Sequence, residues 1–125
     1  MITYIKDFNR DFSFEVIISA IDADDPAQVR LAIKNGADVN CDNVNGWTPL
    51  HHAFDYAIDG MIQNNRTSPS PEILEIITIL LNAGANLQSR DTVGNTPLAL
   101  LNTYAGSLDG FNALKDLFRA IIPDI

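Results

Sequence analysis

At 125 residues the chain is long enough for one domain with a continuous core and too short for two. Hydrophobic residues make up 46% and charged residues 19%, the balance of a folded globular protein, and neither a bilayer-spanning apolar run nor a signal peptide is recognisable. Sixteen acidic residues against eight basic ones give a formal charge of −8, which argues against binding to nucleic acids or anionic membranes.

The first third of the chain predicts a pair of helices, at residues 14–23 and 26–35, with Asp24 and Asp25 between them. The second helix carries apolar residues at helical spacing and is followed by Gly36. Glycine readily adopts the left-handed conformation that commonly closes a helix, so we expect this helix to end there.

The middle third predicts a turn and then a second pair of helices. Residues 43–46 are polar and suit a tight reversal, after which Thr48 takes the N-cap position and Pro49 the first helical position. We expect this helix to be extended into residues 59–70, which end in a Ser- and Pro-rich loop. The next helix is expected at residues 71–82, with Ser70 as its N-cap.

The last third begins as a second copy of the middle one. Residues 84–99 align with residues 36–51 without a gap, and Gly-Ala, a turn glycine and Thr-Pro-Leu are identical in both. We therefore expect a helix from Pro97 and a partner helix at residues 111–122, stopped by Pro123. Internal repetition of this kind decides the architecture of a chain.

The residues from Thr48 to Ala53 read Thr-Pro-Leu-His-His-Ala, which resembles the signature of the ankyrin repeat. The resemblance extends over residues 14–122. It implies an all-α ankyrin-repeat solenoid of three helix-turn-helix repeats with short β-turn fingers, in one domain spanning residues 1–125. In this division residues 1–13 are an N-terminal extension, and the repeats lie at about 14–40, 41–88 and 89–125.

The chain departs from the ankyrin pattern in two places. The two Thr-Pro-Leu signatures lie 48 residues apart, whereas the family period is about 33, and the surplus falls between the helices of the second repeat. In the third repeat, Ala99 replaces the histidine of the signature and Leu101 replaces its small residue.

No group of residues predicts catalysis, a cofactor or a metal site. Adjacent helical residues point about 100° apart, so His51 and His52 cannot face one ion together. The family resemblance implies instead that His51 forms hydrogen bonds that tie its turn together. Cys41, the single cysteine, is expected as a packed thiol without a disulfide, which makes the reducing cytosol the expected location.

The family resemblance also implies where a partner binds, because ankyrin proteins use the turn tips and the exposed face of each first helix as a concave surface. The positions that correspond here are Asp22, Asp24, Asp25, Val44, Asn45, Trp47, Asp55, Tyr56, Thr92, Val93, Asn95, Thr103 and Tyr104. Aromatic side chains surrounded by carboxylates suit a basic protein partner. The alternative is that the aromatics only cover neighbouring repeats and the acids only keep the domain soluble.

The expected function is therefore binding of another protein, not catalysis, by a chain that is more often monomeric than self-associated. One concrete version is a small inhibitor or immunity protein that blocks a basic enzyme or toxin. The competing hypothesis is a structural unit that self-associates through apolar solenoid ends, for which residues 111–122 supply an apolar helix.

Overall fold

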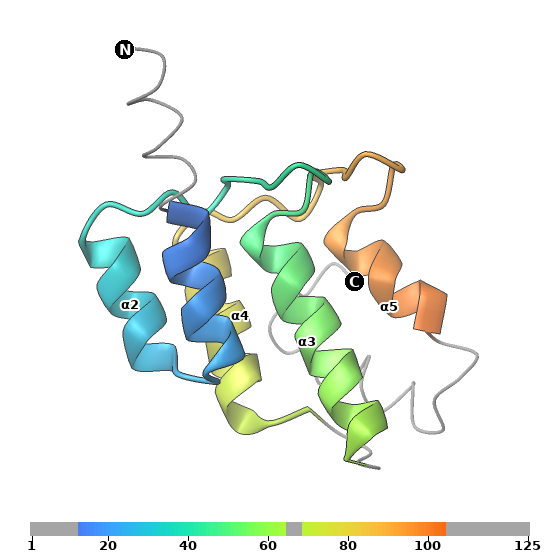
Figure 1. Ribbon diagram of the computed structural model, residues 1–125, viewed down its shortest axis with the longest axis horizontal. Coiled ribbons are helices and arrows are strands. Elements are labelled where there is room, and N and C mark those ends of the chain that lie inside the picture. Colours follow the sequence, from blue (N-terminus) through green and yellow to red (C-terminus); the bar gives the residue numbers. More distant parts are fainter. Residues whose placement is uncertain (1–12, 65–68, 105–125) are drawn as a thin grey trace.

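The computed structural model describes residues 13–64 and 69–104 and shows a stack of helices joined by turns (Figure 1). A helix at 13–22 is followed by α2 (Pro26–Lys34), α3 (Pro49–Gln63), α4 (Pro71–Asn82) and α5 (Pro97–Tyr104). These residues contain no strand, and none of their helices has the length and apolar character needed to cross a membrane. The predicted all-α solenoid is confirmed.

Helices α2 to α5 each begin after a residue whose side chain satisfies free amides of the first turn. Ser70 Oγ accepts from Ile73 N at 3.2 Å and caps α4, as predicted, with proline next in the chain. Asp25 Oδ1 accepts from the amides of Ala27 and Gln28 and caps α2. Thr48 occupies the N-cap position of α3, and its predicted role is likewise confirmed.

Helices α2 and α4 end in the same two-bond motif. Gly36 and Gly84 each have a φ of 97°, the left-handed conformation expected of a terminating glycine. In both places the glycine amide donates three residues back and the next amide donates five residues back, as Ala37 N does to Ala32 O at 3.0 Å. The structure thereby confirms both glycines as helix terminators.

The helices form two layers around one core. Helix α3 packs against α5 and α4, and α2 packs against α4, while His52 of α3 contacts Asp22 at the end of the helix at 13–22. Phe54 and Leu50 of α3 are fully buried, as are Ile76 and Ile77 of α4. Cys41 is buried, so its packed thiol is confirmed.

The surplus residues of the second repeat lengthen its first helix. Helix α3 runs on to Gln63, which confirms the predicted extension. Residues 65–68 of the predicted loop and the whole predicted helix at 111–122 lie outside the described residues. The division into repeats at 14–40, 41–88 and 89–125 stays a prediction.

Candidate binding surface

Two turns with the same pattern of internal hydrogen bonds project from one edge of the molecule, before α3 and before α5 (Figure 1). We call residues 40–47 the first finger and residues 88–95 the second finger. In the first, Asn43 Oδ1 accepts from Asn45 N at 2.9 Å and Trp47 N at 3.0 Å. In the second, Asp91 Oδ1 accepts from Val93 N at 3.1 Å and Asn95 N at 2.8 Å. Each finger is therefore a closed, internally bonded loop.

The two fingers are also bonded to each other. Thr92 N donates to Asn45 O at 3.0 Å, so one backbone hydrogen bond joins their tips. Trp47 Nε1 donates to Asp91 Oδ2 at 3.1 Å. At the base of the first finger, the Asn40 side chain donates to Gly84 O at 3.0 Å and accepts from Asn86 N at 2.8 Å. These contacts hold the tips in a fixed register.

His51 is a structural residue of the first finger and bonds to the second. Its ring is fully buried, and Nδ1 accepts from Thr48 N at 3.1 Å, so this nitrogen carries no proton. Nε2 then bears the proton and donates to Asn95 O at 2.8 Å. The local bonding implied by the family resemblance is present, and it reaches into the next repeat as well.

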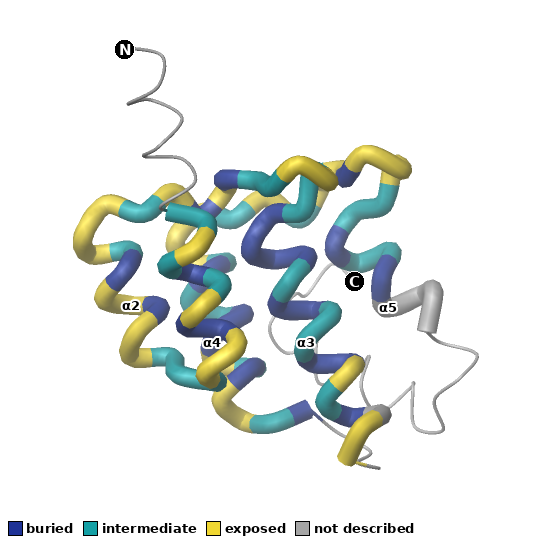
Figure 2. The backbone as a smooth tube through the Cα atoms, in the orientation of Figure 1, coloured by how far each residue is buried: buried dark blue, intermediate teal, exposed yellow. Residues whose placement is uncertain are grey.

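The fingertips present apolar side chains to solvent. Val44 is 94% exposed and Val93 is 78% exposed, and the two valines lie at the tips of consecutive fingers, one position apart in the alignment of the two copies. Their neighbours Asn45 and Thr92 are exposed too, and Figure 2 shows the exposed stretches along this edge. Asn95 is half-buried. Large apolar side chains exposed on two joined tips are candidates for contact with a partner.

Trp47, the aromatic residue predicted at the tip, lies lower in the finger. Its ring stacks on that of His51 with the centroids 6.1 Å apart, and its indole N–H bonds to Asp91. Trp47 is half-buried and covers the junction of two repeats, which is the position that the alternative interpretation requires. Part of the side chain stays accessible at the edge of the fingers.

The first helices of repeats one and two supply the acidic part of the surface. Asp22 is exposed and its Oδ1 lies 2.9 Å from His52 Nε2, while Asp24 and Asp25 form the turn beyond it. Asp55 and Tyr56 follow on α3 and are half-buried. Thr103 and Tyr104 belong to α5, but their side chains are outside the part of the chain that the structure describes.

The carboxylates create a negative potential along α3. Burial raises the pKa of Asp55, and the charge of Asp59 raises it further, against the opposing effect of His52. Burial also raises the pKa of the Tyr56 phenol, and the charges of Asp24 and Asp22 add to the rise. In both adjacent residues burial is the larger cause, and the neighbouring carboxylates act in the same direction, as expected where negative charges gather.

Asp91 is a residue that sequence reasoning missed. Burial alone would raise its pKa, but hydrogen bonds from the amides of Asn95 and Val93 and from the Trp47 indole outweigh this effect and lower it. The signal was present in the alignment of the two copies, because Asp91 occupies the place of Asn43. Both side chains accept hydrogen bonds, and a turn residue of this type at one position in both copies indicates a repeated turn geometry.

Comparisons with known proteins agree with this geometry. A family model described as ankyrin repeats (many copies) matches residues 17–56, and one described as ankyrin repeat matches residues 45–92. The 2-5A-dependent ribonuclease of Mus musculus is 32% identical over 85 residues. That stretch is 67% of this chain and 10% of the ribonuclease, so the chain spans about a tenth of the length of this relative.

Proposed function

This chain belongs to the ankyrin repeat family, and from that premise we propose that it binds a basic protein through its fingers and through the acidic face of the helix at 13–22 and α3. Ankyrin repeats are in general modules of protein–protein interaction. What this chain adds is a particular apolar and acidic surface. The observation that carries the proposal is the pair of exposed valines, Val44 and Val93, at adjacent fingertips that the hydrogen bond from Thr92 N to Asn45 O joins.

The rigidity of the fingers supports a binding role. Apolar side chains on a turn are ordinarily costly to order against a partner, because binding immobilises both the loop and the side chains. Here Asn43, Asp91 and the Asn45–Thr92 bond already hold the backbone. The entropic cost is then met on folding, and more of the contact energy remains for binding.

The charge of the chain supports a basic partner. The net charge of −8 includes Asp55 and Asp59 on α3, and Asp22 and Asp24, whose charges act on Tyr56 of the same helix. A negative surface steers a positive partner and raises its association rate. A stoichiometric inhibitor of a basic enzyme is one form that this function takes in our proposal.

The ribonuclease relative does not suggest an enzyme here. The matching stretch is a tenth of that protein. We propose that the chain acts by binding alone.

The test is to capture the partner from the native source and to measure its affinity for variants. A Val44→Ser and Val93→Ser double variant removes the apolar tips, and Leu31→Ser on α2 is the matched control, because Leu31 is another large exposed hydrophobic residue (48%) away from the fingers. We expect the double variant to bind at least tenfold more weakly and the control to bind as the wild type does. Equal affinity of both would overturn the role of the fingertips.

The acidic face is tested separately. We expect Asp59→Lys on α3 to slow association, whereas Glu72→Lys on α4 reverses the same charge on the other layer and leaves the rate nearly unchanged. Equal association rates for the two variants would mean that the rate depends on the net charge of the chain and not on the position of the acidic residues. If wild type captures no protein and sediments as a dimer, self-association replaces this proposal.

A further inference from the structure

The helix at 13–22 ends like α2 and α4, but with an aspartate in place of the glycine. Asp24 has a φ of 55° and is the only non-glycine residue with a positive φ in the described part of the chain. Asp24 N donates to Ile21 O and Asp25 N donates to Ala20 O, the pattern seen at Gly36 and Gly84. The left-handed conformation costs an L-residue about 1 kcal/mol or more relative to glycine, so the aspartate side chain is present despite an unfavourable backbone conformation.

The carboxylate of Asp24 is held at the start of α4. Ser70 Oγ lies 3.3 Å from both carboxylate oxygens and donates to them, while the same oxygen accepts from Ile73 N as the N-cap. The turn of the first repeat is thus fixed to the second helix of the next one, 46 residues further along the chain. The charge has a defined position.

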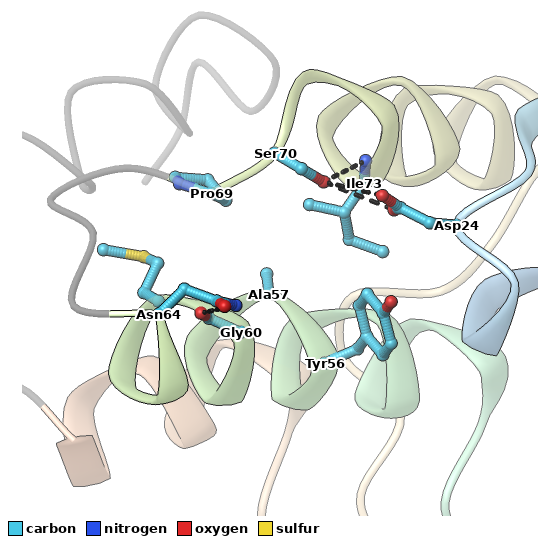
Figure 3. A pocket seen from close by; sticks show the side chains of 9 residues that line it. Asp24, Tyr56, Ala57, Gly60, Asn64, Pro69, Ser70 and Ile73 are labelled. Atoms are coloured by element: carbon cyan, nitrogen blue, oxygen red, sulfur yellow. Dashed lines mark hydrogen bonds between the residues drawn. The ribbon is translucent and has the colours of Figure 1, made fainter.

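Beside this carboxylate lies a cavity of about 200 Å³ between α3 and the start of α4 (Figure 3). Asp24 and Tyr56 stand at one end, with the phenol oxygen turned toward the side where Asp24 lies. Apolar side chains, those of Ala57, Met61, Pro69 and Ile73, line the cavity between its two polar ends. At the other end the Asn64 side chain donates to Gly60 O at 2.8 Å.

The residues beyond the usual repeat length build this cavity. Gly60 and Met61 lie in the last turns of α3, Asn64 follows this helix, and Pro69 and Ser70 precede α4, so five of the nine lining residues come from the insertion. Figure 1 shows this end of α3 at the edge opposite the fingers. The cavity is therefore a feature of this chain and lies apart from the fingertips.

Size and lining restrict what the cavity can hold. Pockets for cofactors and drug-sized molecules measure about 300–1,000 Å³, which exceeds this one. Apolar walls that lead to a carboxylate and an aromatic ring suit an aliphatic chain with a positive end, because the carboxylate pairs with the charge and the ring face attracts it. Burial raises the pKa of Tyr56, and the negative charges of Asp24 and Asp22 beside the phenol raise it further.

We propose that this cavity receives one basic side chain, a lysine or an arginine, of the protein partner. The inference rests on the proposed function for the source of that side chain, while the chemistry of the cavity is independent of it. The aliphatic stem packs against Ala57 and Ile73, and the cationic head lies between Asp24 and Tyr56.

The cavity is tested with the side chain alone as a probe. n-Butylammonium is titrated into the full chain, with 1-butanol as a neutral molecule of the same shape and n-butylguanidinium as the arginine counterpart. The readout is the amide NMR shifts of Ala57, Gly60 and Ile73. We expect saturable shifts with a Kd on the order of 10 mM for one or both cations. Equal binding of 1-butanol would overturn the proposal.

Charge-matched variants locate the effect. Asp24→Asn keeps a residue type that tolerates a positive φ and an oxygen that accepts from Ser70, but removes the charge. Asp38→Asn removes one charge from an exposed turn and retains the acceptor for Asn40 N. We expect Asp24→Asn to bind the cation about fivefold more weakly than Asp38→Asn does. Asp24→Gly, which relieves the backbone, shows the same loss if Asp24→Asn folds poorly.

Two further results decide against the proposal. If Asp24→Asn and Asp38→Asn bind the probe equally, the carboxylate has no role. If Arg66→Gln gains affinity for the probe tenfold, the arginine that the sequence places between Asn64 and Pro69 is the occupant, not a partner residue.

The captured partner completes the test. Weaker binding to Asp24→Asn than to Asp38→Asn supports the proposal. Equal binding to these two, together with loss of binding in the fingertip variant, overturns the cavity proposal and leaves the proposed function intact. If no partner is captured, the proposed function fails, and the probe titration alone decides whether the cavity selects a cation.

Discussion

Asp91 illustrates how a single carboxylate can join two repeats. One oxygen accepts the amides of Val93 and Asn95 within its own finger, and the other accepts the indole N–H of Trp47 from the preceding one. Asn43 makes only the first kind of contact in its finger. A carboxylate, unlike an amide, accepts with both oxygens, which explains why the second finger uses aspartate.

The pKa of Asp91 gives a pH-dependent prediction. Its folded pKa lies below the ordinary value of 3.8, so the ionised group stabilises the fold above that pH, and the contribution is lost as pH falls through the folded pKa. In Asp91→Asn the side-chain amide has one oxygen. If this oxygen accepts from the amides of Val93 and Asn95, the NH₂ group faces the Trp47 indole N–H; if it accepts from the indole, the two backbone amides lose their acceptor. We expect this variant to unfold at lower urea than wild type at pH 7, with the gap closing below about pH 4.

Trp47 fluorescence reports the urea unfolding of wild type and of Asp91→Asn at each pH, since the chain has one tryptophan. A gap of constant size from pH 7 to the acid range would show that the ionised state of Asp91 is not what stabilises the junction.

At the scale of the element, the two fingers have the same turn geometry but differ in how closely other residues pack against their glycines. Gly46 and Gly94 have φ values of 75° and 89°, so both positions disfavour a side chain. A Cβ at Gly46 would also lie 3.0 Å from Asp91 Cα and 3.1 Å from Thr92 N, whereas none of the described residues comes within 4 Å of one at Gly94. The first finger is packed against the second.

The two glycines therefore form a matched pair. We expect Gly94→Ala to cost about 1–2 kcal/mol of unfolding free energy from the positive φ. Gly46→Ala carries the same strain and adds about 1–3 kcal/mol, because backbone atoms of the second finger have to move. Urea unfolding of both variants measures the difference. Equal losses would mean that the contact between the fingers yields without cost.

Local signals predicted the elements well, because the residues that start and stop helices act over a few positions. Ser70, Pro71, Gly36 and Gly84 all fill the roles expected from their neighbours in the chain. The site was less accessible to sequence. The bond from Trp47 to Asp91 joins residues 44 apart, and no local pattern shows that this indole turns inward while Val44 stays exposed. The cavity beside Asp24 likewise depends on a contact 46 residues away.

At the scale of the whole molecule, charge opposes folding. Like charges on a chain with a net charge of −8 repel one another more strongly when the chain is compact. The ion pair between Arg30 and Glu75, at 3.4 Å, is about half exposed on both sides and compensates little. The free energy of unfolding should then increase with ionic strength, because salt screens the repulsion between like charges.

Raising the salt concentration from about 0.01 M to about 0.1 M shortens the Debye length from about 30 Å to about 10 Å. We expect the thermal midpoint at pH 7 to rise by a few degrees, equivalent to roughly 1 kcal/mol. The control is the same series near the isoelectric point of about 4.4, where the effect should vanish. A midpoint that falls with salt at pH 7 would show that attractive pairs dominate.

The bonds between the fingers also bear on how the chain folds during translation. His51 and Trp47 find their partners 44 residues downstream, in Asn95 and Asp91. A ribosome that adds about 5–20 residues per second needs roughly 2–9 s to make that stretch. During that interval His51 and Trp47 in the nascent second repeat lack their hydrogen-bond acceptors in the second finger. We expect this repeat to reach its final packing only after the second finger has emerged.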